Sequence, residues 1–184
     1  MKLPDYLETE HLVLRRWKTT DAKDILEYVS LPEVAYPAGF LPVTTLAEEV
    51  AYLANDYPRE LQSKNLPGGY GLTVKGVDKI IGSIDFNHRL ADDILELGYL
   101  LHPDYWGQGL MVEASRAFLS QAFSTLPLHK VELECYDYNH ASKRVAEKLG
   151  FRLEATLRDR KDIRGERCNL LRYGILKREW EGEI

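Results

Sequence analysis

The sequence predicts a mixed α/β fold in the order β-α-α-βββ-α-β-α-ββ, built around one sheet that contains antiparallel and parallel strands. Residues 69–101 read as three strand-like runs joined by short turns, which is typical of an antiparallel meander. After Leu101 a helical pattern leads to another strand, and such a crossover places two strands in parallel. With 184 residues, 45% of them hydrophobic, the chain is long enough to form one domain over residues 1–184.

The first third of the chain predicts one strand and two helices. Leu12–Trp17 alternates in polarity as a strand does, and Thr20-Asp21 is suited to cap a helix over Ala22–Ser30. Prolines and a glycine break the next stretch into a loop, and Thr44 or Thr45 then begins a second helix. The expected apolar face of that helix is Leu46, Val50 and Leu53, with Glu48 and Glu49 in its first turn.

The rest of the chain predicts six strands and two helices. Glycines, asparagines and aspartates mark the turns, and Gly150 stands where a helix ends in the left-handed conformation. Residues 158–167 are a run of charges between the last two strands. The expected strands are Gly69–Lys75, Lys79–Arg89, Ile94–Leu101, Leu128–Tyr136, Phe151–Leu157 and Cys168–Leu176, and the expected helices are Leu110–Thr125 and Asn139–Leu149.

Charge and composition exclude several classes of function. A net charge of −5 makes nucleic acid an unexpected partner. The two cysteines, Cys135 and Cys168, are far apart and have no metal-ligand spacing, so we expect no zinc site and a reducing, cytoplasmic location. Cys135 lies within a strand pattern and is expected to be a buried, inert thiol. The opening MKLPDYLETE lacks an apolar run, and no segment approaches roughly 18 apolar residues, so we expect neither a signal peptide nor a membrane span.

The segment LLHPDYWGQGLM (Leu100–Met111) joins an apolar strand to a helix through a turn with two glycines. Gly107 and Gly109 let the backbone approach a ligand closely, and the first amides of the helix point outward as phosphate donors. The P-loop and dinucleotide fingerprints do not fit, because Leu110-Met111 and Val112 stand where Lys-Ser/Thr and a third glycine are required. The alternative is a turn that binds nothing.

Three segments together resemble the GCN5-related N-acetyltransferase superfamily, most closely the group that contains the ribosomal-protein N-terminal acetyltransferases RimJ and RimL. They are LETEHLVLRRWKTTDA (Leu7–Ala22), LGYLLHPDYWGQGLMVEA (Leu97–Ala114) and YNHASKRVAEKLGF (Tyr138–Phe151). The chain departs from the usual signature at Asp104, where Gln or Arg is common, and at Leu110-Met111, where this group often has Tyr-Ala. Neither change removes the backbone amides.

The resemblance implies transfer of an acetyl group from acetyl-CoA to an amine, with no metal. It places the pyrophosphate on the amides of Gly107, Gln108, Gly109, Leu110 and Met111. It also implies that the strand Ile94–Leu101 carries a bulge and splays from the next, so that the pantetheine arm pairs along Leu100, Leu101 and His102. The Leu100 N–H is then the expected oxyanion donor. A contact of this type stabilises the transition state by roughly 3–4 kcal/mol.

The resemblance also suggests residues that handle protons. Glu96 is the expected general base, with Asp85 and Asn87 as alternatives on the neighbouring strand. Asn139 is expected against the CoA arm, although it is also a good helix cap. Ser142 is the expected donor to the thiolate, because no tyrosine lies further along that helix. Lys143 and Arg144 either reach CoA phosphates or are solvated.

Several side chains and the acceptor are left open. The aromatic residues expected to line the acceptor pocket or the core are Trp17, Tyr36, Phe40 and Tyr99. His88 and His102 lack metal-pair spacing, and Arg158–Arg167 is a solvated hairpin or a substrate or dimer edge. The expected acceptor is a protein N-terminal α-amine. The alternatives are a small-molecule amine, such as an amino acid, polyamine or antibiotic, or a non-catalytic acyl-CoA-binding protein, and a homodimer is possible.

Overall fold

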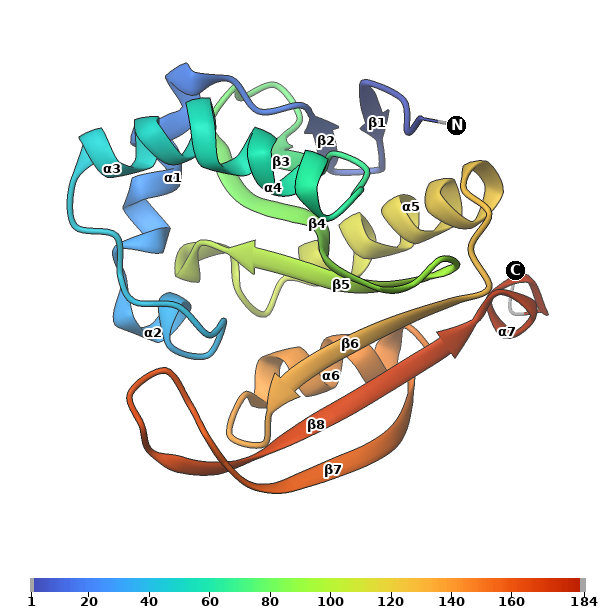
Figure 1. The fold of residues 1–184 in the computed structure, drawn as a ribbon. Helices are drawn as coiled ribbons and strands as arrows, with labels where there is room; N and C mark the ends of the chain where they lie inside the picture. The colour runs from blue at the N-terminus through green and yellow to red at the C-terminus, as the bar shows by residue number, and fades with distance from the viewer. Residues whose placement is uncertain (1, 183–184) are drawn as a thin grey trace.

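The computed structural model describes residues 2–182, so residue 1 and residues 183–184 of the expected domain lie outside it. Eight strands form one mixed sheet in the order β1-β2-β3-β4-β5-β6-β8-β7 (Figure 1), which confirms the predicted α/β class. The strands are β1 (Tyr6–Glu8), β2 (Leu12–Arg15), β3 (Tyr70–Val74), β4 (Ile80–Ala91), β5 (Ile94–Leu101), β6 (Lys130–Tyr136), β7 (Arg152–Lys161) and β8 (Arg167–Leu176).

Helices cover both faces of the sheet and divide the core in two. In Figure 1, α5 and α6 lie behind the sheet, while α1, α3 and α4 lie in front of its upper half. The larger cluster of buried side chains joins the sheet to α5 and α6, and the smaller one joins it to α1 and its neighbours. The helices are η1 (Thr19–Asp21), α1 (Ala22–Val29), α2 (Pro32–Ala35), α3 (Leu46–Ala51), η2 (Tyr52–Asp56), α4 (Tyr57–Ser63), η3 (Pro103–Tyr105), α5 (Leu110–Thr125), α6 (His140–Lys148) and α7 (Lys177–Gly182).

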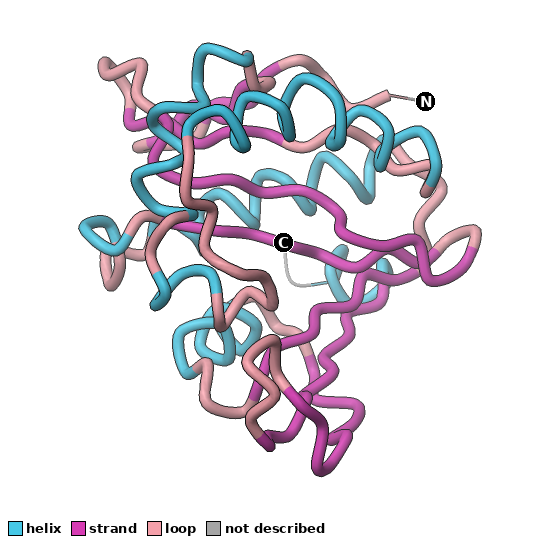
Figure 2. Tube along the Cα trace, turned by 60° about the vertical axis from the view of Figure 1, so that its left-hand side comes forward, coloured by secondary structure: helices cyan, strands magenta, loops and turns pink. Residues whose placement is uncertain are grey.

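The strand pairing agrees with the predicted topology, and one detail differs. Strands β1 to β5 are antiparallel neighbours, β5 and β6 are parallel, and β6, β8 and β7 are antiparallel. The bulge expected in β5 is absent from its pairing with β4, where the register shifts instead fall on the β4 side, around Asn87 and Leu90. Figure 2, turned by 60°, shows the β7–β8 hairpin as the lower tip of the molecule.

The region between β2 and β3 differs most from the sequence prediction. The expected second helix continues through α3, η2 and α4, and a capping box in which Thr45 accepts from the Glu48 N–H fixes its start. Of its expected apolar face, Leu53 is buried as predicted, but Leu46 and Val50 are 45% and 39% exposed. Glu49, which was not expected to be buried, is only 3% exposed.

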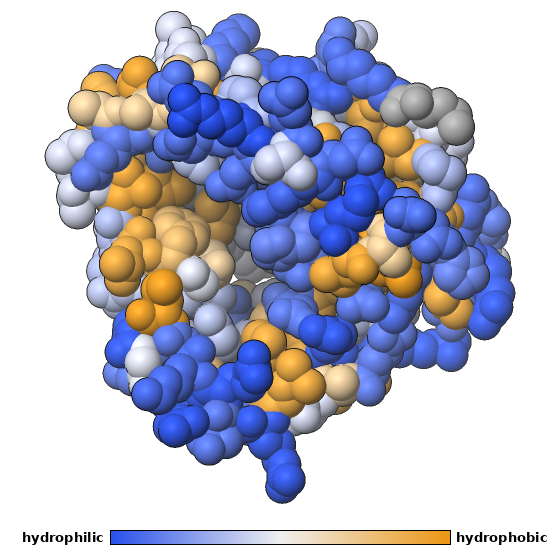
Figure 3. Space-filling view, viewed as in Figure 1, coloured by the Kyte–Doolittle hydropathy of each residue, from blue (hydrophilic) through white to orange (hydrophobic). Residues whose placement is uncertain are grey.

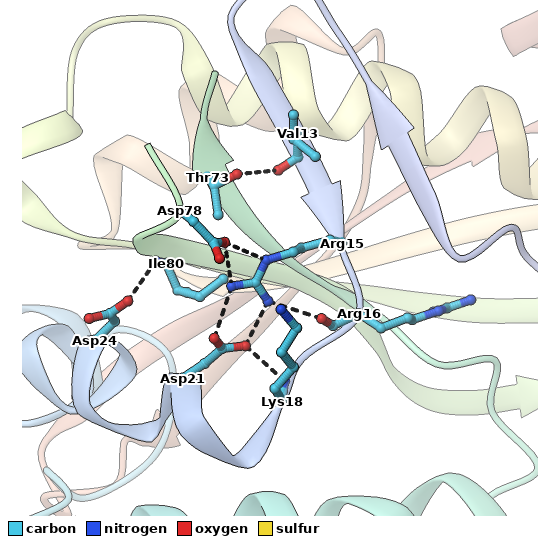
Figure 4. Close-up of polar contacts among 9 residues, drawn as sticks. All are labelled: Val13, Arg15, Arg16, Lys18, Asp21, Asp24, Thr73, Asp78 and Ile80. Carbon is cyan, nitrogen blue, oxygen red and sulfur yellow. Dashed lines mark hydrogen bonds and ion pairs between the residues drawn. The ribbon is translucent and has the colours of Figure 1, made fainter. Parts of the chain in front are cut away.

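A polar cluster holds α1 against the sheet (Figure 4). Arg15 of β2 makes a two-pronged ion pair with Asp21, at 2.7 and 2.9 Å, and its Nε donates to Asp78 at 2.9 Å. Asp24 of α1 accepts a hydrogen bond from the Ile80 N–H at 3.0 Å, which ties α1 to the start of β4. The α1 helix is thereby fixed over the sheet face that carries the even-numbered residues of β5.

Two simpler expectations can be compared directly with the fold. Cys135 is buried, and burial raises the pKa of its thiol to about 11, so it is the inert thiol that was predicted. Within residues 2–182, none of the helices has both the length and the apolar composition that crossing a bilayer requires.

Candidate active site

Strands β5 and β6 part shortly after they begin. They pair in parallel only from Ile94 with Lys130 to Glu96 with Glu132, although β5 continues to Leu101 and β6 to Tyr136. The two strands converge on one side of Figure 1 and separate toward α2. A cavity of about 1180 Å³ lies there, lined by residues 97–101 of β5 and by Leu133 and Glu134 of β6.

The register decides which backbone groups of β5 face this opening. The His102 N–H donates to the Ile81 carbonyl at 2.8 Å, and hydrogen-bonded pairs alternate along antiparallel strands, so the Leu100 N–H also faces β4. The backbone groups of Leu97, Tyr99 and Leu101 face the opening instead. The Leu101 carbonyl accepts a hydrogen bond from Trp106 Nε1 at 2.8 Å. The expectation that the Leu100 N–H and His102 face the cofactor is therefore wrong in register, and Tyr99 and Leu101 take their place.

Strand β6 forms the opposite edge of the opening, and its backbone groups also alternate in direction along the strand. The Asp137 N–H donates to the Asn169 carbonyl at 2.9 Å, so the odd-numbered residues of β6 bond to β8. The backbone groups of Glu134 therefore face β5, whereas the Tyr136 carbonyl already accepts the Asn139 N–H at 2.9 Å. An extended ligand that carries amide groups fits between two such strand edges as an added strand.

The glycine turn lies at the far end of β5. Gly107 and Gly109 have positive φ angles of 75° and 81°, and a Cβ at either position would have no heavy atom within 4 Å. Gly109 is the N-cap of α5, and no side chain caps this helix. Gly107, Gly109, Leu110 and Met111 line the cavity, while the Gln108 side chain folds back onto the Asp104 carbonyl at 3.0 Å. The turn therefore presents open space and helix amides to the same cavity, as a pyrophosphate requires.

Helix α6 closes this half of the cavity. Asn139 Oδ1 accepts the Ser142 N–H at 3.1 Å and so acts as the helix cap, while its Nδ2 donates to the Pro37 carbonyl at 3.4 Å. Asn139, Arg144 and Lys148 line the cavity, whereas Lys143 does not. Of the two basic residues that the sequence suggested for CoA phosphates, only Arg144 is therefore in position.

A tyrosine that sequence analysis assigned to the acceptor pocket contacts the predicted proton donor. Tyr99 Oη and Ser142 Oγ are 2.8 Å apart, both side chains line the cavity, and Ser142 is buried. Burial raises the pKa of the Tyr99 hydroxyl, and its hydrogen bond to Ser142 opposes the rise. Sequence analysis found no tyrosine along α6, and the structure places a tyrosine of β5 beside Ser142.

Two carboxylates near the opening have a raised pKa. Burial raises the pKa of Glu96 to about 7, and the charge of Glu134 adds to the effect. Glu96 sits at the last paired position of β5 and is not among the residues that line the cavity. Burial likewise raises the pKa of Asp85 to about 7. Asp85 lines the cavity and pairs with Gly98, next to Tyr99, so of these two carboxylates Asp85 is the one that reaches the cavity.

The remaining predicted residues divide between the cavity and its surroundings. Trp17 and Phe40 line the cavity, whereas Tyr36 lies outside it with the Arg164 guanidinium 5.3 Å from its ring centroid. Arg164 also pairs with Asp162, which is buried, whereas the other residues of 158–167 are exposed, as expected for a solvated hairpin. Within residues 2–182, no group of three His, Cys, Asp or Glu side chains is arranged to hold a metal ion.

The space-filling view shows how these parts meet at the surface. In Figure 3, apolar and weakly polar side chains gather around a hollow on the side of the molecule that carries α1 and α2. The cavity lining comes from helices on both faces of the sheet, namely α1 and α3 on one face and α5 and α6 on the other. The phosphate turn, the strand opening and Asp85 therefore belong to one continuous cavity.

Comparison with known proteins decides the family. A model of the acetyltransferase (GNAT) domain matches residues 11–152. The chain belongs to the GNAT acetyltransferase family. An uncharacterized N-acetyltransferase of Bacillus licheniformis, p20, is 30% identical over 179 residues, covering 96% of this chain and 98% of its own. These similarities make the chain an acyl-CoA-dependent N-acetyltransferase.

Proteins that are similar to this chain differ in the acceptor that their names describe. Spermidine N(1)-acetyltransferase of Escherichia coli K12 is 29% identical over 100 residues, covering 54% of this chain and 52% of its own. The crystal structure of a Salmonella typhimurium acetyltransferase, described as modifying the N-terminal serine of ribosomal protein L7/L12, has a TM-score of 0.78 and 18% identity, covering 91% of this chain and 96% of its own. That structural likeness concerns the fold alone.

Proposed function

We propose that this chain acts as one domain that transfers the acetyl group of acetyl-CoA directly to a primary amine, with both substrates bound at once. The observation that carries the proposal is the single cavity that joins the open edges of β5 and β6, the glycine turn and Asp85. Acetyl-CoA supplies an activated thioester when bound. The two unpaired strand edges suit its amide-containing arm, and the open space at Gly107 and Gly109 suits its pyrophosphate.

The residues of this chain divide the chemistry between them. The Tyr99 N–H, aimed at the opening, donates to the thioester oxygen as negative charge develops on it. Asp85 takes a proton from the attacking ammonium, directly or through water, and the nitrogen then forms a bond to the acetyl carbon. The carbon–sulfur bond breaks, and the Ser142 hydroxyl, bonded to Tyr99, gives a proton to the departing sulfur. The second proton that the nitrogen loses as the amide forms returns to the Ser142 oxygen through water. The products are the acetylated amine and CoA. Glu96 remains an alternative base that would act through water.

The acceptor has two candidates. The resemblance to the RimJ and RimL group favours a protein N-terminal α-amine, whose pKa near 8 leaves part of it neutral without help. We call the side of the cavity that is lined by α1 and α3 its acceptor half. The carboxylates there, including Glu49, Glu60 and Asp85, favour a small cationic amine. Neither candidate changes the roles proposed for the chain's residues.

Calorimetric titration with acetyl-CoA and with CoA tests the cofactor half of the proposal. We expect binding in the micromolar range, with Gly109→Glu much weaker. Failure to bind at millimolar ligand would remove the proposed site. Release of CoA thiol in the presence of amines then tests the transfer, and a protein that binds acetyl-CoA but acetylates no peptide or small amine would be a binding protein.

A further inference from the structure

Helix α3 buries a carboxylate and exposes its apolar residues. Glu49 is its one buried residue, at 3% exposure, whereas Leu46 and Val50 face solvent. A helix on a protein surface normally does the opposite. Departures of this kind from local sequence logic are expected at functional sites. The position of Glu49 therefore needs an explanation other than core packing.

The Glu49 carboxylate has no partner that would explain its burial. No hydrogen bond or ion pair to it occurs among residues 2–182, and it lines the acceptor half of the cavity. The carboxylate of its neighbour Glu48 accepts hydrogen bonds from the Thr44 and Thr45 N–H groups in the capping box of α3. Glu60 pairs with Lys64 at 3.2 Å. An unpaired buried carboxylate is costly. A cation that enters the cavity would remove that cost.

Other unpaired polar groups surround the same space. Trp17 Nε1 and Tyr28 Oη are buried without a hydrogen-bond partner in the described chain, and both residues line the cavity. Burial and the nearby charges of Asp85, Glu60 and Glu49 raise the pKa of the Tyr52 hydroxyl, so these carboxylates border one region. That region is acidic and also offers donors.

Apolar surface completes the region. The side chains of Val29, Val34, Phe40 and Leu53 line it, together with the ring of Tyr28. Such walls suit a chain of methylene groups and do not suit the polar backbone of a peptide. Carboxylates at separate positions on apolar walls match a molecule whose charges are separated by a hydrocarbon chain.

We propose that Glu49 binds a second ammonium group of the acceptor, and that the acceptor is a small linear diamine or polyamine. One amine lies beside Asp85 and Tyr99 and receives the acetyl group, while the other is held by Glu49. This inference rests on the acetyl transfer proposed above. It selects the small-molecule acceptor over the protein N-terminus.

Steady-state kinetics with matched amines test the inference. Release of CoA thiol would be followed with 1,4-diaminobutane, with longer and shorter diamines, with n-butylamine and with a serine-initiated peptide. For the diamine of best length, we expect kcat/KM at least tenfold above that for butylamine. Glu49→Gln should raise KM for this diamine at least tenfold, with kcat within twofold, and should leave butylamine unchanged.

Two further variants separate a binding role from a structural one. Glu49→Asp keeps the charge on a side chain shorter by one methylene, so the preferred diamine should lengthen. Glu27→Gln removes the same charge from an exposed residue of α1 that pairs with Lys79 outside the cavity, and it should change nothing for either amine. Acetyl-CoA affinity and thermal melting of Glu49→Gln report whether the fold is retained.

The outcomes distinguish this inference from the proposed function. If butylamine or the peptide is acetylated as efficiently as every diamine, or if Glu49→Gln leaves the diamine KM unchanged, the second ammonium site is refuted and the transfer stands. If acetyl-CoA binds but no amine is acetylated, the transfer fails and this inference fails with it.

Discussion

Replacing Asp85 with asparagine removes the carboxylate that we propose as the base while keeping the size of the side chain. Asp85 lines the cavity beside Tyr99, and burial holds its pKa at about 7. General base catalysis by a positioned side chain contributes roughly 10²–10⁴-fold. We therefore expect Asp85→Asn to lower kcat by at least about 100-fold, with little change in acetyl-CoA affinity.

The pH profile follows from the same pKa. Only the ionised form of Asp85 accepts a proton, and with a pKa near 7 about a tenth of it is ionised at pH 6 and about nine tenths at pH 8. The kcat of the natural chain should therefore rise about tenfold between these values and then level off. Asp85→Asn should lose this rise together with the rate.

Single-turnover and steady-state release of CoA thiol between pH 6 and pH 9 would measure both effects. Glu96→Gln is the matched control, because burial also raises the pKa of Glu96 to about 7 but Glu96 does not line the cavity. It should stay within threefold of the natural rate. If Asp85→Asn keeps the rate and the rise while Glu96→Gln loses both, the assignment is refuted and Glu96 is the base.

Three other predictions concern single groups. Because burial raises the pKa of Glu49 from 4.5 to about 7, the folded state binds its proton more tightly, so the contribution of Glu49 to the free energy of unfolding without substrate should fall by roughly 2 kcal/mol between pH 4.5 and pH 7. Urea unfolding at both pH values should show a fall that is smaller by this amount in Glu49→Gln, because Asp85 and Glu96 still contribute in the variant. An equal fall in the variant and the natural chain would contradict the prediction. Gly109→Glu should weaken acetyl-CoA binding at least 100-fold in calorimetry, well beyond Gly109→Ala, which shares the cost of roughly 1–2 kcal/mol for a side chain at positive φ. Ser142→Ala and Tyr99→Phe should each lower kcat about tenfold, and the double variant should be little worse because the two hydroxyls share one hydrogen bond.

The cofactor half of the site was largely predictable because its determinants are local. Two glycines between a strand and a helix specify a turn with positive φ, and the structure has both at Gly107 and Gly109. Asn139 was identified as a cap from its position before a helical pattern, and its side chain bonds to the Ser142 N–H. Such features depend on residues a few positions apart.

The register of β5 against β4 and the face that α3 buries were not predictable from the sequence. The identity of the β5 residue whose N–H faces the opening depends on its pairing with β4. Register shifts occur in β4 around Asn87 and Leu90, before the turn between these strands. The residues around Leu100 do not determine how many register shifts occur in β4. The sequence therefore predicted that the Leu100 N–H faces the opening, whereas the Tyr99 N–H does. Similarly, Leu46 and Val50 predict the wrong buried face for α3, because the helix turns Glu49 into a cavity built by distant segments.

The separation of β5 and β6 also affects the stability of the protein in a cell. Unpaired strand edges invite pairing with other polypeptides, which is a common route to aggregation. A ligand that binds only the folded state at one hundred times its Kd stabilises it by about 2.7 kcal/mol. If acetyl-CoA fills the opening as proposed, the metabolite completes the sheet. We therefore expect starvation for acetyl-CoA to expose the chain to aggregation and proteolysis, so that its abundance follows the supply of its own substrate.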